Sequence, residues 1–371
     1  MQKNNVPIPS TIKHRPLTIA IDVSQMAYSG TGVARYVSGL TKALLLSGSS
    51  HQFIFYAGAL RQRSFFSKLS LTSPWNRAAW RILPLPPKIA SSVLGSLPIP
   101  FEWLTGSADL LHSSDWVEPS SRLPMCTTIH DLVFHQYPST VDPLIRRAQE
   151  GRLVRLTHNH TQIIADSEST KNDLMEIYNF APSRLNVIYP GVESQYAPQS
   201  KKEIDRVKRK YNLPDQYILS LGTQEPRKNI TRLIEAIEGL NFPLIIVGKY
   251  GWGEQTQSLG FVPEVDLPGL YSGATVFAYP SLYEGFGFPV IEAMACGAPV
   301  VTSNVSSLPE IAGDAAVLVD PEDISSIRAG IEEAISTRSK LIGLGLIQAQ
   351  KFTWKHCAQQ VLEVYDKIIG H

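Results

Sequence analysis

The sequence predicts an α/β protein with two parallel β-sheets, one in each half of the chain. Short apolar runs alternate with amphipathic stretches along both halves, a pattern typical of parallel sheets covered by helices. Pro190, Gly191 and Pro198 interrupt the pattern, which indicates a linker near Tyr189–Ser200. A chain of 371 residues is also long enough for two domains that each bury a core.

The individual elements follow from the same periodicity. Leu17–Val23 is apolar and β-branched and predicts a first strand, and a turn at Gly30–Gly32 leads into a helix that Gly48 ends. Asn229 stands where a side chain would cap a later helix. Further strands are predicted at 53–56, 110–112, 126–129, 162–165, 217–222, 243–248, 275–279 and 299–303, and further helices at 142–158, 229–239, 289–296 and within 349–369.

The composition excludes several classes of protein. The three cysteines, Cys126, Cys296 and Cys357, are scattered and odd in number, which argues against a disulfide framework and a zinc site. No apolar run approaches the length of a transmembrane helix, and the polar segment 1–17 does not resemble a signal peptide. We therefore expect a cytoplasmic protein.

The charge is unevenly distributed. The chain has a net charge of +1, yet 24–100 contains no Asp or Glu and eight Lys or Arg residues. This asymmetry indicates an anionic partner, either a membrane surface or a phosphorylated ligand. Segment 60–100 also contains aromatic residues, which suits an anionic bilayer interface or a lipid diphosphate, although an irregular, solvated insertion explains the composition equally well. These aromatic residues include Phe65, Phe66, Trp75 and Trp80.

Two motifs in the first half point to a ligand crevice. Gly30-x-Gly32 at the start of a helix suits a phosphate, although a packing turn is an equal alternative. Arg35 replaces the small residue of a dinucleotide fingerprint and no acidic residue follows, so NAD binding is not expected. His130 follows the strand at 126–129, where parallel strands face ligands, but a structural role for such a histidine stays open.

The second half contains two stronger motifs. In the turn after Gly222, Arg227 and Lys228 form a cationic pair that suits a diphosphate, with a solvated basic turn as the alternative. Glu284 enters the loop Gly285–Gly287, and Glu292 follows in the next helix. Two carboxylates in so apolar a segment indicate a binding pocket rather than a packing role.

This last motif resembles the E-x(7)-E signature of family 4 glycosyltransferases, which are retaining enzymes with the two-domain GT-B fold. Segment 279–323 is typical of that family, and the other motifs occur in the expected order along essentially the whole chain. The resemblance implies an acceptor-binding domain at 1–190 and a nucleotide-sugar-binding domain at 191–350. It also implies that the helix in 351–371 packs back on the first domain.

The resemblance also implies roles for individual residues. Glu284 would contact hydroxyls of the donor sugar, Glu292 the nucleotide ribose, and His130 the transferred sugar. Arg227 and Lys228 would neutralise the diphosphate, over which the Gly30–Gly32 loop would close. The remaining donor-binding residues would be Gly222, Gly285, Phe286 and Gly287. No metal cofactor is expected, because similar enzymes are metal-independent and the sequence contains no Asp-x-Asp motif.

The expected activity is therefore the transfer of a hexose from a nucleotide diphosphate sugar to a glycan or lipid-linked acceptor in cell-surface polysaccharide synthesis. GDP-mannose is the first candidate donor, followed by UDP-hexoses and dTDP-rhamnose. The enzyme would work at the cytoplasmic membrane face, with segment 60–100 as the membrane side and no nucleic acid among its partners. A sugar-nucleotide epimerase and a non-catalytic nucleotide-sugar-binding protein stay open as alternatives.

Overall fold

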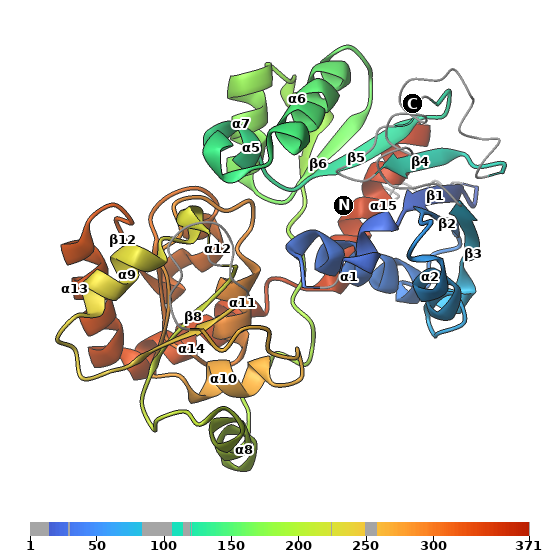
Figure 1. The fold of residues 1–371 in the computed structure, drawn as a ribbon. Coiled ribbons are helices and arrows are strands. Elements are labelled where there is room, and N and C mark those ends of the chain that lie inside the picture. Colours follow the sequence, from blue (N-terminus) through green and yellow to red (C-terminus); the bar gives the residue numbers. More distant parts are fainter. Residues whose placement is uncertain are drawn as a thin grey trace, which may run out of the picture.

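The structure is a computed structural model, and it describes residues 15–28, 30–83, 106–113, 119, 121–223, 225–248 and 258–370. The described chain forms two parallel β-sheets, each with its own helices, and a last helix returns to the first sheet (Figure 1). The predicted α/β architecture with two parallel sheets is confirmed.

The first sheet contains seven strands. They are β1 (Thr18–Asp22), β2 (Gln52–Gly58), β3 (Ala79–Leu83), β4 (Leu110–Ser113), β5 (Met125–Ile129), β6 (Gln162–Ala165) and β7 (Leu185–Val187). Their order is β3-β2-β1-β4-β5-β6-β7, with every neighbouring pair parallel. The strand order reverses at β1, and in such sheets ligands bind beyond the carboxyl ends of the strands at this point.

The described α-helices of the first half are α1 (Gly32–Leu46), α2 (Arg63–Leu69), α5 (Val133–Gln136), α6 (Pro143–Thr157) and α7 (Glu168–Tyr178). The start of α1 is fixed locally. Gly30 adopts a φ of +89°, which favours glycine, and the hydroxyl oxygen of Thr31 accepts the N–H of Ala34 at 3.1 Å. The apolar face of α1, including Tyr36 and Leu44, is buried in the first core, so the turn before it is held beside β1.

The second sheet contains five strands in the second half of the chain. They are β8 (Ile218–Leu221), β9 (Leu244–Val247), β10 (Val276–Tyr279), β11 (Val300–Ser303) and β12 (Ala316–Val319). Their order is β12-β11-β10-β8-β9, again with parallel neighbours. The accompanying helices are α8 (Lys201–Tyr211), α9 (Ile230–Ile237), α10 (Leu267–Gly273), α11 (Phe288–Ala295), α12 (Leu308–Ala312), α13 (Ile324–Ser336) and α14 (Arg338–Ala349).

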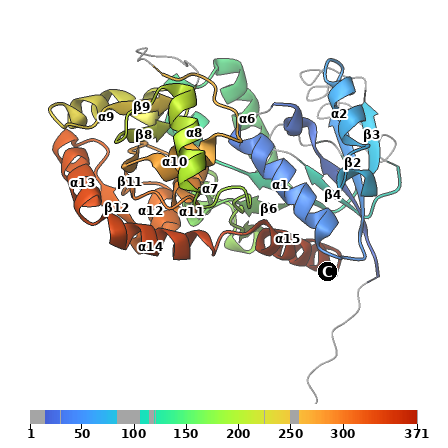
Figure 2. The same cartoon turned by 90° about the horizontal axis from the view of Figure 1, so that it is seen from below.

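The chain then crosses back to the first sheet. Helix α15 (Trp354–Ile369) follows α14 along one side of the molecule and lies beside α1 (Figure 2). Its Tyr365 hydroxyl lies 2.6 Å from Nδ1 of His112 on β4. The ring of Trp354 takes the space beside Gly39, where a Cβ would approach it to 2.1 Å. A side chain at position 39 would therefore displace the start of α15 from α1.

The structure differs from the sequence-based expectations in segment 60–100 and at Asn229. Segment 60–100 contains α2 and β3, which were not predicted from the sequence, and 84–100 lies outside the described residues. Asn229 stands at the predicted N-terminal cap position of α9, but its side chain forms no capping hydrogen bond with this helix. Asn229 has a φ of +60°, and its Nδ2 donates to the carbonyls of Pro280 at 3.0 Å and Pro321 at 2.6 Å. Its side chain thus ties the start of α9 to two loops. Across the described ranges, no helix is long and apolar enough to span a bilayer.

Candidate active site

The loops after β5 and β10 meet in backbone contact between the two domains. A Cβ built on Gly285 would lie 2.0 Å from the carbonyl oxygen of His130, so only glycine fits at this position. The hydroxyl of Thr170 at the start of α7 also donates to that carbonyl, at 3.3 Å. The structure therefore brings the predicted His130 beside the predicted loop Gly285–Gly287.

Glu284 lies between the two predicted cations. Its Oε2 is 2.9 Å from Nη1 of Arg227, and its Oε1 is 2.6 Å from Nζ of Lys228. The hydroxyl of Tyr279, at the end of β10, donates to the same Oε1 at 2.8 Å. The turn between β8 and α9 supplies both cations, so two adjacent strand ends build this cluster. Gly222 leaves room for it, because a Cβ there would approach Cε of Lys228 to 3.3 Å.

The charges of this cluster depend on one another. Burial alone would raise the pKa of Glu284, but Arg227 and Lys228 outweigh burial and lower it to about 2. Burial and repulsion by Arg227 lower the pKa of Lys228, although Glu284 opposes them. The Nε of Arg227 is buried and makes no hydrogen bond within the described part of the chain. Because buried donors are normally paired, this N–H suits an acceptor on a ligand, such as a phosphate oxygen.

His130 is held by an aspartate at the end of the neighbouring strand. Its Nδ1 lies 2.6 Å from Oδ2 of Asp166, which follows β6. The ring of Tyr36 on α1 packs edge-on against the imidazole, with 4.8 Å between the ring centres. Burial raises the pKa of Asp166, although His130 opposes this. Asp166 and Tyr36 thus fix the orientation of the imidazole ring in the cleft.

The starts of α1 and α11 lie close together at the contact between the two domains. A Cβ on Gly32, the first residue of α1, would lie 3.8 Å from the ring of Phe288, the first residue of α11. Gly287 precedes α11 with a φ of +100°, and the carbonyl of Phe286 accepts the hydroxyl of Ser307 at 3.0 Å. Two helix N-termini so close together favour an anion between the domains.

Glu292 is completely buried and paired with a residue of the other domain. Its side chain is 0% exposed, and its Oε1 forms an ion pair with Nη1 of Arg35 on α1. The hydroxyl of Tyr271 on α10 donates to Oε2 at 2.9 Å. Burial raises the pKa of Glu292, against the effect of Arg35. The sequence did not predict this contact between α1 and α11.

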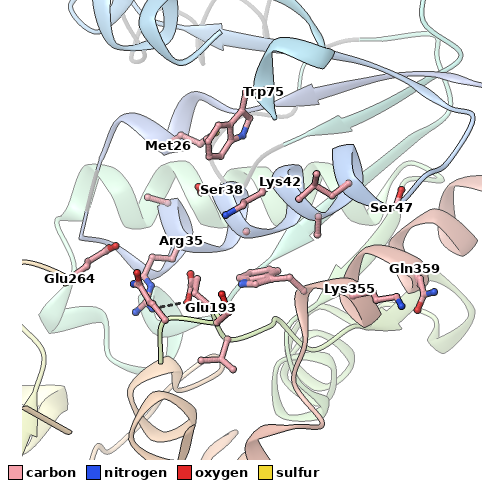
Figure 3. Close-up of a pocket in the computed structure, with 18 of the residues that line it drawn as sticks. Met26, Arg35, Ser38, Lys42, Ser47, Trp75, Glu193, Glu264, Lys355 and Gln359 are labelled. Atoms are coloured by element: carbon pink, nitrogen blue, oxygen red, sulfur yellow. Dashed lines mark hydrogen bonds and ion pairs between the residues drawn. The ribbon is translucent and has the colours of Figure 1, made fainter. Parts of the chain in front are cut away.

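A cavity of about 670 Å³ is lined by Arg35 and runs along α1 (Figure 3). It is bounded by α1, by 192–195 and by the start of α15, and Glu264 from the second domain reaches its rim. Among the described residues predicted for the site, Gly30 lines the cavity, whereas Glu284 and His130 do not. The cavity therefore extends the site on the side of the first domain, beginning at Arg35.

Several residues of the site were missed in the sequence. Asp166 follows the strand at 162–165, so the same strand-end argument that selected His130 applies to it. Arg35 entered the sequence argument only as a departure from the dinucleotide fingerprint. Glu310 on α12 accepts the N–H groups of Glu168 and Ser169 at 3.0 Å each, and no sequence pattern linked it to the first turn of α7.

Comparisons with known proteins agree with this geometry. Residues 30–196 match the family model described as Glycosyltransferase Family 4, and residues 201–342 match that of Glycosyl transferases group 1. The O-antigen chain mannosyltransferase B of Escherichia coli is 35% identical over 280 residues, which cover 69% of this chain and 74% of that protein. The chain belongs to the group 1 glycosyltransferases. This glycosyltransferase is also 32% identical over 282 residues to the serotype-specific mannosyltransferase WbdA of Escherichia coli, covering 68% of the chain but 34% of WbdA.

Solved structures share the fold of this glycosyltransferase. Sucrose-phosphate synthase from Thermosynechococcus elongatus superposes with a TM-score of 0.73 at 20% identity, over 95% of this chain and 99% of that one. The Anabaena protein HepE in complex with UDP and glucose gives a TM-score of 0.69 at 18% identity, over 95% and 100% of the two chains. The expected GT-B fold is thus confirmed.

Proposed function

We propose that this glycosyltransferase is a retaining hexosyltransferase that uses a nucleotide diphosphate sugar, with GDP-mannose as the first candidate. The acceptor is a glycan or a lipid-linked sugar of a cell-surface polysaccharide. The observation that carries the proposal is the pairing of Glu284 with both Arg227 and Lys228. Beside this pair, the buried Nε of Arg227 has no hydrogen-bond partner among the described residues. Similarity to O-antigen mannosyltransferases supports mannose as the transferred sugar.

In this proposal the diphosphate binds Arg227 and Lys228, whose charges stabilise the leaving group as the bond to the sugar breaks. Glu284 accepts hydroxyls of the donor sugar, Glu292 accepts those of the ribose, and His130 lies against the transferred sugar. The Gly30–Gly32 loop closes over the diphosphate. Gly222, Gly285, Phe286 and Gly287 line the donor. The two cations supply positive charge at the leaving group, so no metal is needed.

The proposal also assigns the two domains and the membrane. Residues 1–190 bind the acceptor, 191–350 bind the nucleotide sugar, and the helix in 351–371 completes the first domain. Segment 60–100 associates peripherally with the cytoplasmic membrane face. Of the four aromatic residues named for this segment, Phe66 is buried and Trp75 and Trp80 pack against the first core, so they do not support this assignment. Its support is the exposure of Leu60 and Phe65 among basic residues. Flotation with anionic but not with neutral liposomes is the expected result, and equal flotation with both contradicts it.

The proposed activity is tested first by ligand binding. The purified chain is heated with GDP, UDP, dTDP and their sugars in the presence of EDTA, and a ligand well above its Kd should raise the melting temperature. The sugar nucleotide that binds is then incubated with lipid-linked and glycan acceptors. Transfer only with an acceptor supports the proposal. An altered free sugar nucleotide would indicate the epimerase, and binding without turnover the non-catalytic alternative.

A matched pair of variants tests the cationic cluster. Arg227→Ala should lower turnover by about 10²- to 10³-fold, the range for loss of one charge-stabilising group in an active site. Arg146→Ala removes an exposed arginine whose Nε lies 3.2 Å from Glu150 on α6, and it should leave turnover unchanged. Equal turnover of the Arg227→Ala variant and the unaltered enzyme would exclude the assigned role.

A further inference from the structure

We infer that Arg35 is paired with the carboxylate of Glu292 in the nucleotide-free enzyme. The ribose of an entering nucleotide then has to displace Arg35 from this carboxylate. The inference rests on the proposed function, in which Glu292 binds the ribose. It makes Arg35, a residue of the first domain, a determinant of nucleotide affinity in the second domain.

The carboxylate of Glu292 is buried, and both of its oxygens have partners. Glu292 has 0% of its side chain exposed, with Tyr271 on one oxygen and Arg35 on the other. To accept ribose hydroxyls, the carboxylate has to turn lone pairs toward the ligand. In the present arrangement no part of the side chain faces solvent, so a ribose reaches it only if one partner moves away.

Of the two partners of Glu292, Arg35 is the one that can move away. Tyr271 is 0% exposed and belongs to the core of the same domain as Glu292. Arg35 comes from α1 of the opposite domain, its side chain is 16% exposed, and it lines the cavity beside α1 (Figure 3). Release of Arg35 therefore disturbs no core, whereas release of Tyr271 opens one.

The guanidinium of Arg35 has other partners that remain after its release from Glu292. Its Nη2 is 3.0 Å from Oε2 of Glu193, which is joined to Arg35 by a dashed line in Figure 3. The guanidinium carbon also lies 5.2 Å from the ring centre of Tyr196 and 5.3 Å from that of Phe288, within cation–π distance of both. Arg35 thus keeps one carboxylate and two aromatic neighbours when it gives up Glu292, so the exchange leaves no buried arginine unpaired.

A buried hydroxyl group beside the Arg35–Glu292 ion pair points independently to a ligand. The hydroxyl of Tyr196 is buried and has no hydrogen-bond partner among the residues that the structure describes. The ring centre of Tyr196 lies 5.2 Å from the guanidinium carbon of Arg35, so this residue lies beside the pair. Buried hydroxyls are normally hydrogen-bonded, and a ribose hydroxyl at Glu292 would supply the missing partner.

The test compares Arg35→Met with the unaltered enzyme. Methionine keeps an apolar stem between the two rings and removes the guanidinium. Calorimetry measures binding of guanosine, GDP, uridine and UDP to each full chain. The variant should bind both the nucleoside and the diphosphate about tenfold more tightly, because the ribose no longer competes with a charge-assisted hydrogen bond. The control, Arg146→Met on α6, should bind them as the unaltered enzyme does.

A second readout separates this exchange from a purely structural role. Without nucleotide the Arg35→Met variant should melt at a lower temperature, because Glu292 has lost its cation. With saturating nucleotide it should melt close to the unaltered enzyme, since Arg35 no longer contacts Glu292 in either protein. An equal loss in both states would overturn the inference, because Arg35 would then stabilise the fold independently of the ligand.

The outcomes distinguish the inference from the proposed function. Weaker or unchanged binding of the nucleosides overturns the inference and assigns Arg35 to direct binding or to packing. Weaker binding of the diphosphates alone overturns it as well, because the guanidinium would then pair with phosphate. If Arg35→Met does not fold, Arg35→Gln carries the same comparison. If no nucleotide binds the unaltered enzyme or the variant, the proposed function itself fails.

Discussion

The carbonyl oxygen of His130 occupies the space that any side chain in place of Gly285 would need. A Cβ on Gly285 would be 2.0 Å from that oxygen and 2.8 Å from Cβ of Asp131. His130 follows β5 in the first domain and Gly285 follows β10 in the second, next to Glu284. The two domains thus meet at backbone level beside the charged cluster, and the absence of one methyl group permits their approach.

The Gly285→Ala variant should therefore lower turnover far more than it weakens nucleotide binding. The added methyl group pushes the His130 loop away, whereas Arg227 and Lys228 lie within the second domain and are not displaced. A displacement of about 1 Å at a reacting centre can lower turnover about hundredfold. The measurements are kcat and the Kd of the nucleotide.

Gly343→Ala is the matched control for this variant. A Cβ on Gly343 in α14 meets no atom within 4 Å, so this variant should retain full turnover. Full turnover in Gly285→Ala would show that the two loops separate without cost to catalysis.

Glu310 joins the domains a second time, through the first turn of α7. Its carboxylate accepts the N–H groups of Glu168 and Ser169 at 3.0 Å each and the hydroxyl of Tyr189 at 2.8 Å. In Glu310→Gln a single carbonyl oxygen replaces the two acceptors, so one of these donors is left unpaired. The expected loss in the free energy of unfolding is about 1 kcal/mol, as for other helix caps, measured by urea denaturation.

The control for Glu310 is Glu332→Gln. Glu332 pairs with Arg328 at 3.4 Å on an exposed surface of α13, where an ion pair contributes little. This variant should unfold like the unaltered protein. Equal stability of both variants would mean that water replaces the Glu310 carboxylate at the start of α7.

The low pKa of Glu284 predicts how its contribution to stability depends on pH. In the folded protein this pKa is about 2, compared with 4.5 for an ordinary glutamate. The folded pKa is the lower one, so the stabilisation is present above about pH 4.5 and is lost as the pH falls toward 2. The difference in unfolding free energy between the unaltered protein and Glu284→Gln should therefore be constant near neutral pH and shrink below pH 4.5. A difference that stays constant in acid would exclude a strongly paired carboxylate.

Local patterns were sufficient to predict the cluster around Glu284. Arg227, Lys228 and Glu284 all follow strand ends of one sheet, and apolar periodicity locates such ends in the sequence. The same reasoning placed His130 at the cleft and would have found Asp166, had it been applied to the strand at 162–165.

Contacts between the domains were not predictable in this way. Arg35 and Glu292 lie on helices of different domains, and neither periodicity nor residue spacing encodes how two domains dock. Glu310 and the start of α7 are a second example. For Gly285, the sequence indicated a close approach to a ligand, and the structure adds a close approach to the backbone of His130.

Asp166 should be needed for turnover rather than for stability. Its Oδ2 holds Nδ1 of His130 at 2.6 Å, and burial raises its pKa, so the folded environment disfavours its charge. Asp166→Asn keeps the size of the side chain and removes a charge that the site destabilises, so the melting temperature should change little. The imidazole, however, loses the carboxylate that orients it. In the proposed function this ring lies against the transferred sugar. Turnover should fall by about 10²-fold or more, in the range expected when a positioned proton-transfer group is disturbed.

Three measurements separate this role from general damage. The Kd of the nucleotide should be unchanged, because in the proposed function His130 lies against the transferred sugar and not against the nucleotide. Asp205→Asn removes an exposed carboxylate, 3.3 Å from Lys201 on α8, and should leave both turnover and melting temperature unchanged. If Asp166→Asn retains full turnover, the orientation of His130 does not limit the reaction, and Tyr36, whose ring packs edge-on against the imidazole, is sufficient to position it.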